Sequence, residues 1–230
     1  MEDLITRALA QGQKALSEYE SKKVLAGYGL PVAREVLAGG EDEAAGAAEG
    51  LGWPVVLKAC GPELMHKSEG GLIVLGLEDR DAVRAAYRRL RDQAGAGAEG
   101  VLVQETVPGP RELLLGLHRD PQFGPVVVAG LGGVLTEILN DAAFRLAPLD
   151  EAEARDMLEE LRGRKIFKAF RGQAPADLGA VCRSLVGLGR LGLERPEVAE
   201  VDVNPLIIRP DGRVTAVDAL VVLKGAAKDA

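Results

Sequence analysis

Hydrophobic and polar positions along this chain follow two different periods, and each period predicts its own kind of element. Short apolar or alternating runs, which are typical of strands, occupy residues 32–37, 54–59, 72–77 and 101–107. The clearest helical spacing lies in residues 79–94, where the apolar stripe consists of Val83, Ala86, Tyr87 and Leu90. Because strands and helices interleave, we expect an α+β or α/β architecture.

Local signals define two further helices, and a third short one precedes them. Ser17 followed by Glu20 is a capping box, which predicts a helix that ends near residues 27–29. The Ala-rich residues 41–51 form the next helix. Residues 2–12 predict a short helix at the start of the chain.

The Pro-Gly-Pro segment at residues 108–110 interrupts this pattern, so we expect a subdomain boundary close to it. Beyond it, two strands joined by a turn occupy residues 112–118 and 126–128. Helical spacing then predicts helices at residues 150–163 and 176–191. We therefore divide the chain into an N-terminal extension, a first subdomain and a second subdomain, at residues 1–16, 17–104 and 105–224.

The last part of the second subdomain, residues 200–218, predicts a β-hairpin. Its turn, Pro-Asp-Gly at residues 210–212, fits a three-residue loop closed by a left-handed glycine. A loop of this length pairs Arg209 with Arg213 and so defines the register of the whole hairpin.

That register places Asn204 opposite Asp218, and strand alternation puts Asp202 on the same face as Asn204. Directly opposed side chains lie about 5 Å apart. Hard oxygen ligands at this separation suit a Mg²⁺ ion. An ordinary hairpin with polar residues on its solvent face explains the same three residues equally well.

The composition argues against several classes of function. The 230 residues are 47% hydrophobic and 3% aromatic and carry a net charge of −7. A nucleic-acid binder is not expected from this charge. We interpret the arginines and lysines within residues 162–171 as a solvated face. The sequence shows no signal-peptide pattern, no apolar run of membrane-spanning length and only two cysteines, so we expect a cytoplasmic protein without a membrane segment.

Lys58 lies near the end of a strongly apolar predicted strand. Val55 and Leu57 face one way along it, while Val56 and Lys58 face the other. A lysine is costly to bury unless an anion pairs with it, and a phosphate group would be such an anion. A lysine that extends into solvent at the strand end is the alternative.

A glycine-containing loop follows this strand. Gly70 and Gly71 could let the loop pack closely over a phosphate, although the loop lacks the spacing of a P-loop. His66, just before them, could accept a phosphoryl group or act as a general base. A structural histidine is the alternative reading.

Two further segments are candidates for ligand contact. Residues 104–107, which contain Gln104, Glu105 and Val107, cross between the predicted subdomains, and their backbone groups suit the edge of an adenine ring. Glu112 shares a strand face with apolar residues, which indicates a polar cleft or a salt bridge.

Taken in order, these candidates resemble one family, the ATP-grasp subunits of ADP-forming acyl-CoA synthetases. Its best-known members are the β subunits of ADP-forming acetyl-CoA synthetase, and succinyl-CoA synthetase β subunits are more distant. The residues that carry the resemblance are Lys58, His66-Lys67-Ser68, Gln104-Glu105, Glu112, Asp202, Asn204-Pro205 and Asp218, with supporting matches at residues 16–20, 28–32, 119–126 and 144–149. One departure is that the glycine pair, Gly70-Gly71, lies about one position earlier than in many members.

The resemblance implies an ATP-grasp fold, in which two α+β subdomains grip ATP or ADP. It implies that Lys58 contacts the phosphates and that His66 relays a phosphoryl group. It assigns the adenine to residues 104–107 and the ribose or nucleotide to Glu112. It assigns Mg²⁺ to Asn204 and Asp218, with Asp202 near the metal.

The resemblance also implies a partner. Family enzymes need a CoA-binding domain and a CoA-ligase domain with the main phosphohistidine, and this sequence has no Rossmann-type glycine pattern and no room for them. We therefore expect a separate α subunit and a hetero-oligomer that converts acyl-CoA, ADP and phosphate into acid, CoA and ATP. The alternatives are a nucleotide-binding regulatory module of an acyltransferase assembly, and a carboxylate–amine ligase.

Overall fold

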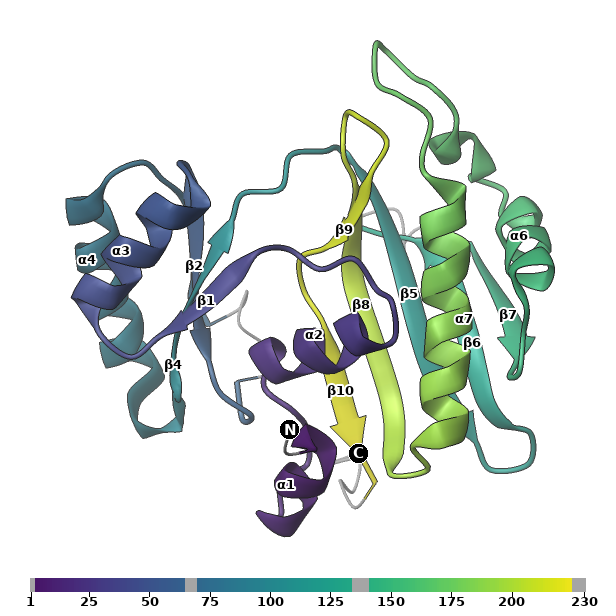
Figure 1. Cartoon of the computed structure of the whole chain (residues 1–230), viewed down its shortest axis with the longest axis horizontal. Coiled ribbons are helices and arrows are strands. Elements are labelled where there is room, and N and C mark those ends of the chain that lie inside the picture. Colours follow the sequence, from purple (N-terminus) through teal and green to yellow (C-terminus); the bar gives the residue numbers. More distant parts are fainter. Residues whose placement is uncertain (1–2, 65–69, 134–140, 225–230) are drawn as a thin grey trace.

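Two antiparallel sheets organise the protein, and the computed structural model describes them through residues 3–64, 70–133 and 141–224. The smaller sheet lies at the left of Figure 1 and has the strand order β1-β4-β2-β3. Its strands are β1 (Glu35–Ala38), β2 (Val55–Cys60), β3 (Ile73–Leu77) and β4 (Gly100–Glu105). Helices α3 (Glu41–Leu51) and α4 (Arg80–Ala94) pack on one face and bury their apolar stripes against it.

The larger sheet has the order β10-β8-β5-β6-β7, with the short strand β9 paired to β8. Its strands are β5 (Arg111–Asp120), β6 (Gly124–Leu131), β7 (Ala142–Leu146), β8 (Val198–Ile208), β9 (Val214–Ala216) and β10 (Leu220–Leu223). Helices α6 (Glu151–Glu160) and α7 (Leu178–Glu194) cover one face of it, and the main hydrophobic core lies between them and the sheet (Figure 1).

Residues 3–30 pack on the larger sheet, although the smaller sheet follows them in the sequence. Helices α1 (Leu4–Ala10) and α2 (Glu18–Gly27) contribute Ile5 and Leu25 to the core of the larger sheet. Backbone bonds join this segment to the last strand, because the Leu16 amide donates to the Val221 carbonyl. The division of the chain at residues 16 and 104 stays a prediction, whereas the observed cores group the first and last parts of the chain together.

The α+β class expected from the sequence is confirmed, since both sheets are antiparallel and helices cover each of them. The capping box at Ser17 and Glu20 is formed, and α3 spans the residues predicted for it. Predicted and observed ends of the other helices differ by up to three residues, a common uncertainty for helix ends. Among the described residues, none of the helices combines the length and apolarity that a bilayer crossing requires.

Candidate functional site

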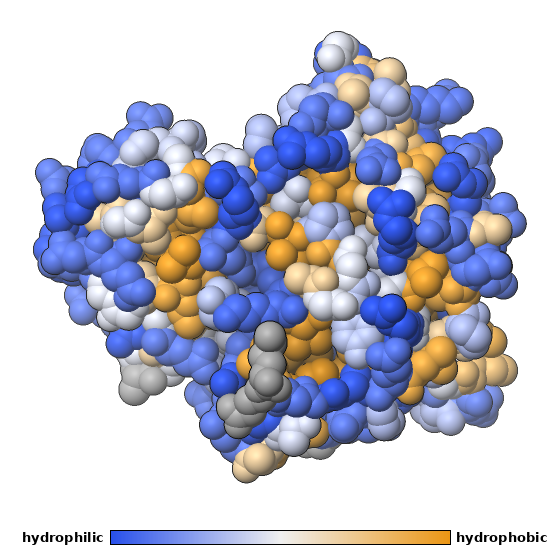
Figure 2. All heavy atoms as spheres, in the orientation of Figure 1, coloured by the Kyte–Doolittle hydropathy of each residue, from blue (hydrophilic) through white to orange (hydrophobic). Residues whose placement is uncertain are grey.

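A cavity of about 560 Å³ lies where the two sheets meet. It is lined by Val56, Lys58, Ile73, Leu75, Gly76, Gln104, Glu105, Thr106, Val107, Asn204, Pro205, Ile207, Val217 and Asp218. We call this cavity the cleft. Its volume is in the range of small-molecule and cofactor sites, and its wall brings together six of the residues singled out from the sequence. Figure 2 shows a notch between the lobes that contain the two sheets, on a face covered largely by hydrophilic side chains.

The hairpin register predicted from the sequence is confirmed. Leu206 pairs with Ala216, and the turn contains Gly212 at φ 89°. On the other side of the proposed pair, Leu220 lies opposite Asp202. Both pairings follow one register.

Asn204 and Asp218 lie between those two pairs, and the same register places them opposite each other. The Val217 amide donates to the Pro205 carbonyl at 3.2 Å, which holds the segments together there. Both side chains line the cleft.

Negative charge accumulates at this end of the hairpin. Burial, together with the carboxylates of Asp218 and Glu200, raises the pKa of Asp202 to about 6. Asp202 is not part of the cleft wall, but it lies one strand position before Val203 and two before Asn204 on β8. A cation at this end would relieve the repulsion.

Lys58 is the buried cation of the opposite wall. It is 5% exposed, and its Nζ lies 2.8 Å from Glu18 Oε1 and donates to the Val217 carbonyl at 2.7 Å. Burial alone would lower the pKa of this ammonium, but Glu18, Asp218 and Glu35 hold its pKa above the usual value. The lysine is therefore charged, and its counter-ion in this structure is a carboxylate from α2.

The side chains of Gln104 and Glu105 form hydrogen bonds with other residues of the protein. The Gln104 amide donates to Glu35 Oε2 and to the Val217 carbonyl, both at 3.0 Å. Glu105 accepts from the Arg34 amide at 3.0 Å and from Arg209 Nη2 at 2.9 Å. Burial alone would raise the Glu105 pKa, but these bonds hold it below the usual value.

Thr106 and Val107 follow the end of β4 and line the cleft. Among the described residues, their backbone amides and carbonyls have no hydrogen-bond partner. Free backbone groups beside apolar walls suit the edge of a flat heterocycle.

The other candidates lie outside the cleft wall. Glu112 is paired in register with Ile207, which does line the cleft, and its carboxylate approaches Gly133. Gly70 and Gly71 are exposed in the turn before β3. His66 lies outside the described residues.

Glu18 was missed as a site residue, because the capping box explained residues 17–20 as a helix start. Its carboxylate binds Lys22 and Lys58 through the same oxygen, at 2.7 and 2.8 Å. A signal was present in the sequence, since Glu18, Lys22 and Leu25 share one face of α2 and Leu25 belongs to the core.

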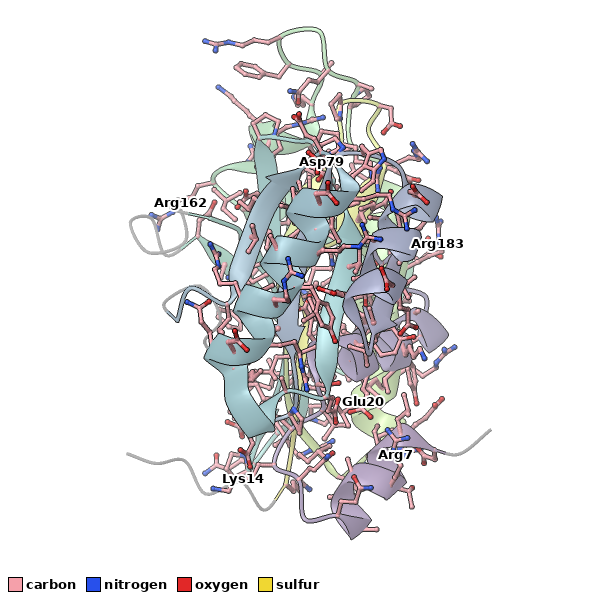
Figure 3. All side chains as sticks on the ribbon, turned by 90° about the vertical axis from the view of Figure 1, so that its left-hand side faces the viewer. Arg7, Lys14, Glu20, Asp79, Arg162 and Arg183 are labelled. Carbon is pink, nitrogen blue, oxygen red and sulfur yellow. The ribbon has the colours of Figure 1, made fainter. Side chains whose placement is uncertain are left out.

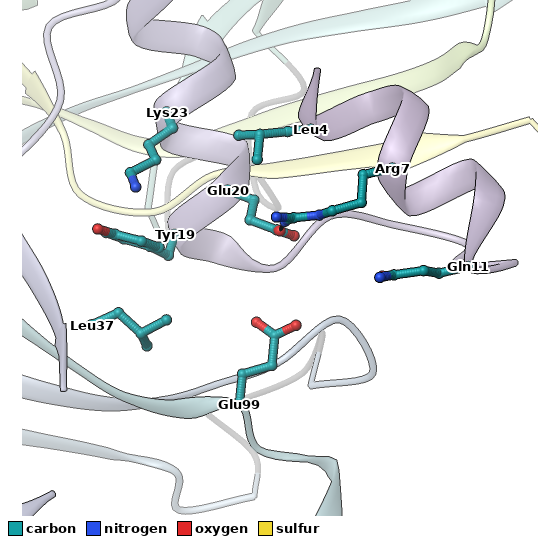
Figure 4. A pocket seen from close by; sticks show the side chains of 8 residues that line it. All are labelled: Leu4, Arg7, Gln11, Tyr19, Glu20, Lys23, Leu37 and Glu99. Atoms are coloured by element: carbon teal, nitrogen blue, oxygen red, sulfur yellow. Dashed lines mark hydrogen bonds and ion pairs between the residues drawn. The ribbon is translucent and has the colours of Figure 1, made fainter. Parts of the chain in front are cut away.

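A second hollow of about 390 Å³ lies between α1, α2 and the smaller sheet (Figure 4). It is lined by Leu4, Arg7, Gln11, Tyr19, Glu20, Lys23, Leu37 and Glu99. Arg7 forms an ion pair with Glu20, and both lie at the same end of the molecule in Figure 3. Burial, followed by the charge of Glu20, raises the pKa of Glu99. None of the residues singled out from the sequence for chemistry lines this hollow.

Comparisons with known proteins agree with this architecture. The ATP-grasp domain family matches residues 7–223. The β subunit of ADP-forming acetate–CoA ligase I from Pyrococcus furiosus is 36% identical over 226 residues, which cover 96% of this chain and 97% of the relative. ADP-forming acetate–CoA ligase I from Archaeoglobus fulgidus is 40% identical over 215 residues, which cover 92% of this chain but 31% of that protein. The chain thus spans about a third of the longer relative.

A solved structure is also closely similar. It is the dinucleotide-forming acetyl-coenzyme A synthetase 1 of Ca. Korarchaeum cryptofilum, in complex with coenzyme A, Ca-AMPCP and HgCl⁺. Its TM-score is 0.91 at 42% sequence identity, and the match covers 96% of this chain and 99% of that one. With the family match over residues 7–223, the conclusion is that this chain belongs to the ATP-grasp domain family.

Proposed function

We propose that this chain is the nucleotide-binding subunit of an ADP-forming acyl-CoA synthetase. The whole enzyme would convert acyl-CoA, ADP and phosphate into a carboxylic acid, CoA and ATP. The observation that carries the proposal is the cleft between the sheets, where a buried, charged Lys58 faces the Asn204 and Asp218 end of the hairpin. Relatives named as β subunits of ADP-forming acetate–CoA ligases support it.

Within the cleft, each wall would bind a different part of the nucleotide. Lys58 would donate to the phosphates. The free backbone groups of Thr106 and Val107 would bind the edge of the base, between apolar side chains such as Ile73 and Ile207. Because the side chains of Gln104 and Glu105 are engaged within the protein, they would shape this segment rather than contact the base.

The oxygen donors of Asn204 and Asp218 fit a Mg²⁺ ion, with Asp202 beside them. Mg²⁺ usually takes one or two carboxylates and completes its shell with waters and substrate phosphates. Among the described residues, no group of three His, Cys, Asp or Glu side chains lies close enough to hold a metal ion by itself. When bound, the ion would neutralise phosphate charge, and the two side chains would hold it at the cleft wall.

The remaining chemistry belongs to other groups. His66 would relay the phosphoryl group between the partner and ADP, and Gly70 and Gly71 would pack near the phosphates. A separate α subunit would supply the CoA-binding domain and the main phosphohistidine. The enzyme would therefore be a hetero-oligomer. We propose a cytoplasmic location for this enzyme. Glu112 would contact the nucleotide from the neighbouring strand.

Calorimetric titration of the purified chain with ADP, with and without Mg²⁺, tests this function. We expect Mg²⁺-dependent binding that Asp218→Ala and Lys58→Met each weaken by at least about tenfold. Failure of the intact chain to bind would contradict the nucleotide site. With a co-expressed partner, ATP formation from acyl-CoA, ADP and phosphate tests the reaction, and activity with an amine in the absence of CoA would favour a carboxylate–amine ligase instead.

A further inference from the structure

The ammonium of Lys58 has two fixed acceptors that both lie inside the protein. Glu18 Oε1 accepts one of its hydrogens at 2.8 Å and the Val217 carbonyl accepts another at 2.7 Å. A lysine ammonium has three donors. Because the same side chain lines the cleft, the third donor remains for a ligand there.

Lys22 keeps the carboxylate of Glu18 neutralised from the other side. Its Nζ lies 2.7 Å from the same oxygen, Glu18 Oε1, and also forms an ion pair with Glu35. Lys22 is 1% exposed, so its ammonium is buried. The two lysines and two glutamates have no net charge, and Glu18 stays paired with Lys22 when Lys58 engages a phosphate.

The Val217 carbonyl ties the same cluster to the hairpin. It accepts from Lys58 at 2.7 Å, from Gln104 at 3.0 Å and from Lys22 at 3.4 Å. Val217 directly precedes Asp218. A small hollow next to the cleft is lined by both Glu18 and Asp218. Glu18 therefore binds Lys58 on one wall of the cleft and shares this hollow with Asp218 of the other wall.

We propose that Glu18 is a positioning residue that holds the Lys58 ammonium in the orientation in which it binds nucleotide phosphate. This inference rests on the proposed function and assigns Glu18 a role in the same site. Lys22 acts as the permanent counter-ion of Glu18. Without the carboxylate, Lys58 would lose its ion pair and its hydrogen bond to α2, and the ammonium would leave its position.

A double-mutant cycle separates positioning from a purely structural role. The variants are Glu18→Gln, Lys58→Met and the double variant, with MgADP as the titrant and the Kd measured by calorimetry. We expect Glu18→Gln to weaken binding about tenfold in the wild-type background and to weaken it no further in the Lys58→Met background. A purely structural effect would weaken binding by the same factor in both backgrounds.

The matched control is Glu20→Gln, two residues away on α2. Glutamine also completes a capping box, and Glu20 has no bond to Lys58. We expect its Kd to equal that of the wild type. If Glu18→Gln does not fold, judged by its thermal unfolding, the cycle is repeated with Glu18→Asp. That variant keeps the charge but shortens the reach, and we expect a smaller loss that also vanishes in the Lys58→Met background.

Three outcomes would overturn the inference. Glu18→Gln could leave the Kd unchanged or lower it, which would mean that Glu18 competes with phosphate for Lys58. Glu18→Gln could raise the Kd by the same factor in the wild-type and Lys58→Met backgrounds, which would make its role structural. Finally, a wild-type chain that binds no MgADP would overturn the proposed function itself, and this inference with it.

Discussion

Arg209 and Glu105 join the two sheets, with Arg209 Nη2 2.9 Å from Glu105 Oε1. Arg209 directly follows β8 of the larger sheet, and Glu105 ends β4 of the smaller one. Arg34 binds the other oxygen of the same carboxylate at 3.1 Å. The two arginines differ in exposure, because the Arg209 side chain is 17% exposed and that of Arg34 is 62% exposed.

This difference predicts unequal contributions to stability. Arg209→Ala should lower the free energy of unfolding by about 1–2 kcal/mol, because it removes a mostly buried charged hydrogen bond. Arg34→Ala should cost less than about 1 kcal/mol, because water screens an exposed pair. Urea unfolding of both variants measures the two losses, and an equal or larger loss for Arg34→Ala would contradict the interpretation.

A second prediction concerns Gly187 on α7. A Cβ at this position would overlap the carbonyl oxygen of Tyr28, so the glycine lets the N-terminal segment dock on α7. Gly187→Ala should therefore lower the free energy of unfolding by about 1–3 kcal/mol.

The control is Gly46 on α3, where a Cβ would meet no atom within 4 Å. Gly46→Ala should raise the free energy of unfolding by about 0.5–1 kcal/mol, because alanine is the better helix former. Denaturant unfolding of both variants checks the opposite signs. A stabilised Gly187→Ala protein would show that α2 does not dock on α7 as described.

A third prediction is that Glu99 makes the stability of the folded protein depend on pH. Its pKa is raised in the folded protein by burial and then by Glu20. Such a carboxyl destabilises the folded state when it is ionised, so the penalty is complete above the folded pKa and absent below the unfolded one. Glu99→Gln should therefore raise the Tm at neutral pH, and the difference should shrink as the pH falls toward about 4.

Thermal unfolding across this pH range measures the effect. Glu78→Gln is the matched control, because Glu78 is exposed on the same lobe. A gain in Tm that is independent of pH, or that appears equally in the control, would show that the charge of Glu99 is not its cause.

A fourth prediction separates the metal from the nucleotide. Asn204→Ala should weaken ADP binding by about tenfold when Mg²⁺ is present and should leave binding without Mg²⁺ unchanged, because its amide oxygen is proposed to ligate the ion. Calorimetry under both conditions provides the comparison. His118→Ala, on an exposed part of β5, should behave as the wild type. An equal loss for Asn204→Ala with and without Mg²⁺ would contradict the metal role.

The local parts of the fold were predictable from the sequence. The turn at residues 210–212 determined the pairing of β8 with β9, because a short loop allows few registers. The capping box and the Ala-rich α3 were predictable for the same reason, since their signals lie within a few neighbouring residues.

The long-range parts were not predictable in this way. Strand β10 continues past Asp218 along the first half of β8, and no turn marks its start. The pairing of Glu18 with Lys58 joins residues 40 positions apart. Sequence spacing within α2 shows that Glu18 and Lys22 share a face, but it does not show which strand covers that face.

Because the helices α1 and α2 share a core with β8 and β10, the smaller sheet is topologically an insertion in the larger lobe. The Leu223 amide donates to the Lys14 carbonyl at 2.8 Å, which ties the last strand to the segment between α1 and α2. A polypeptide fused at either end would therefore be tethered to the larger lobe alone.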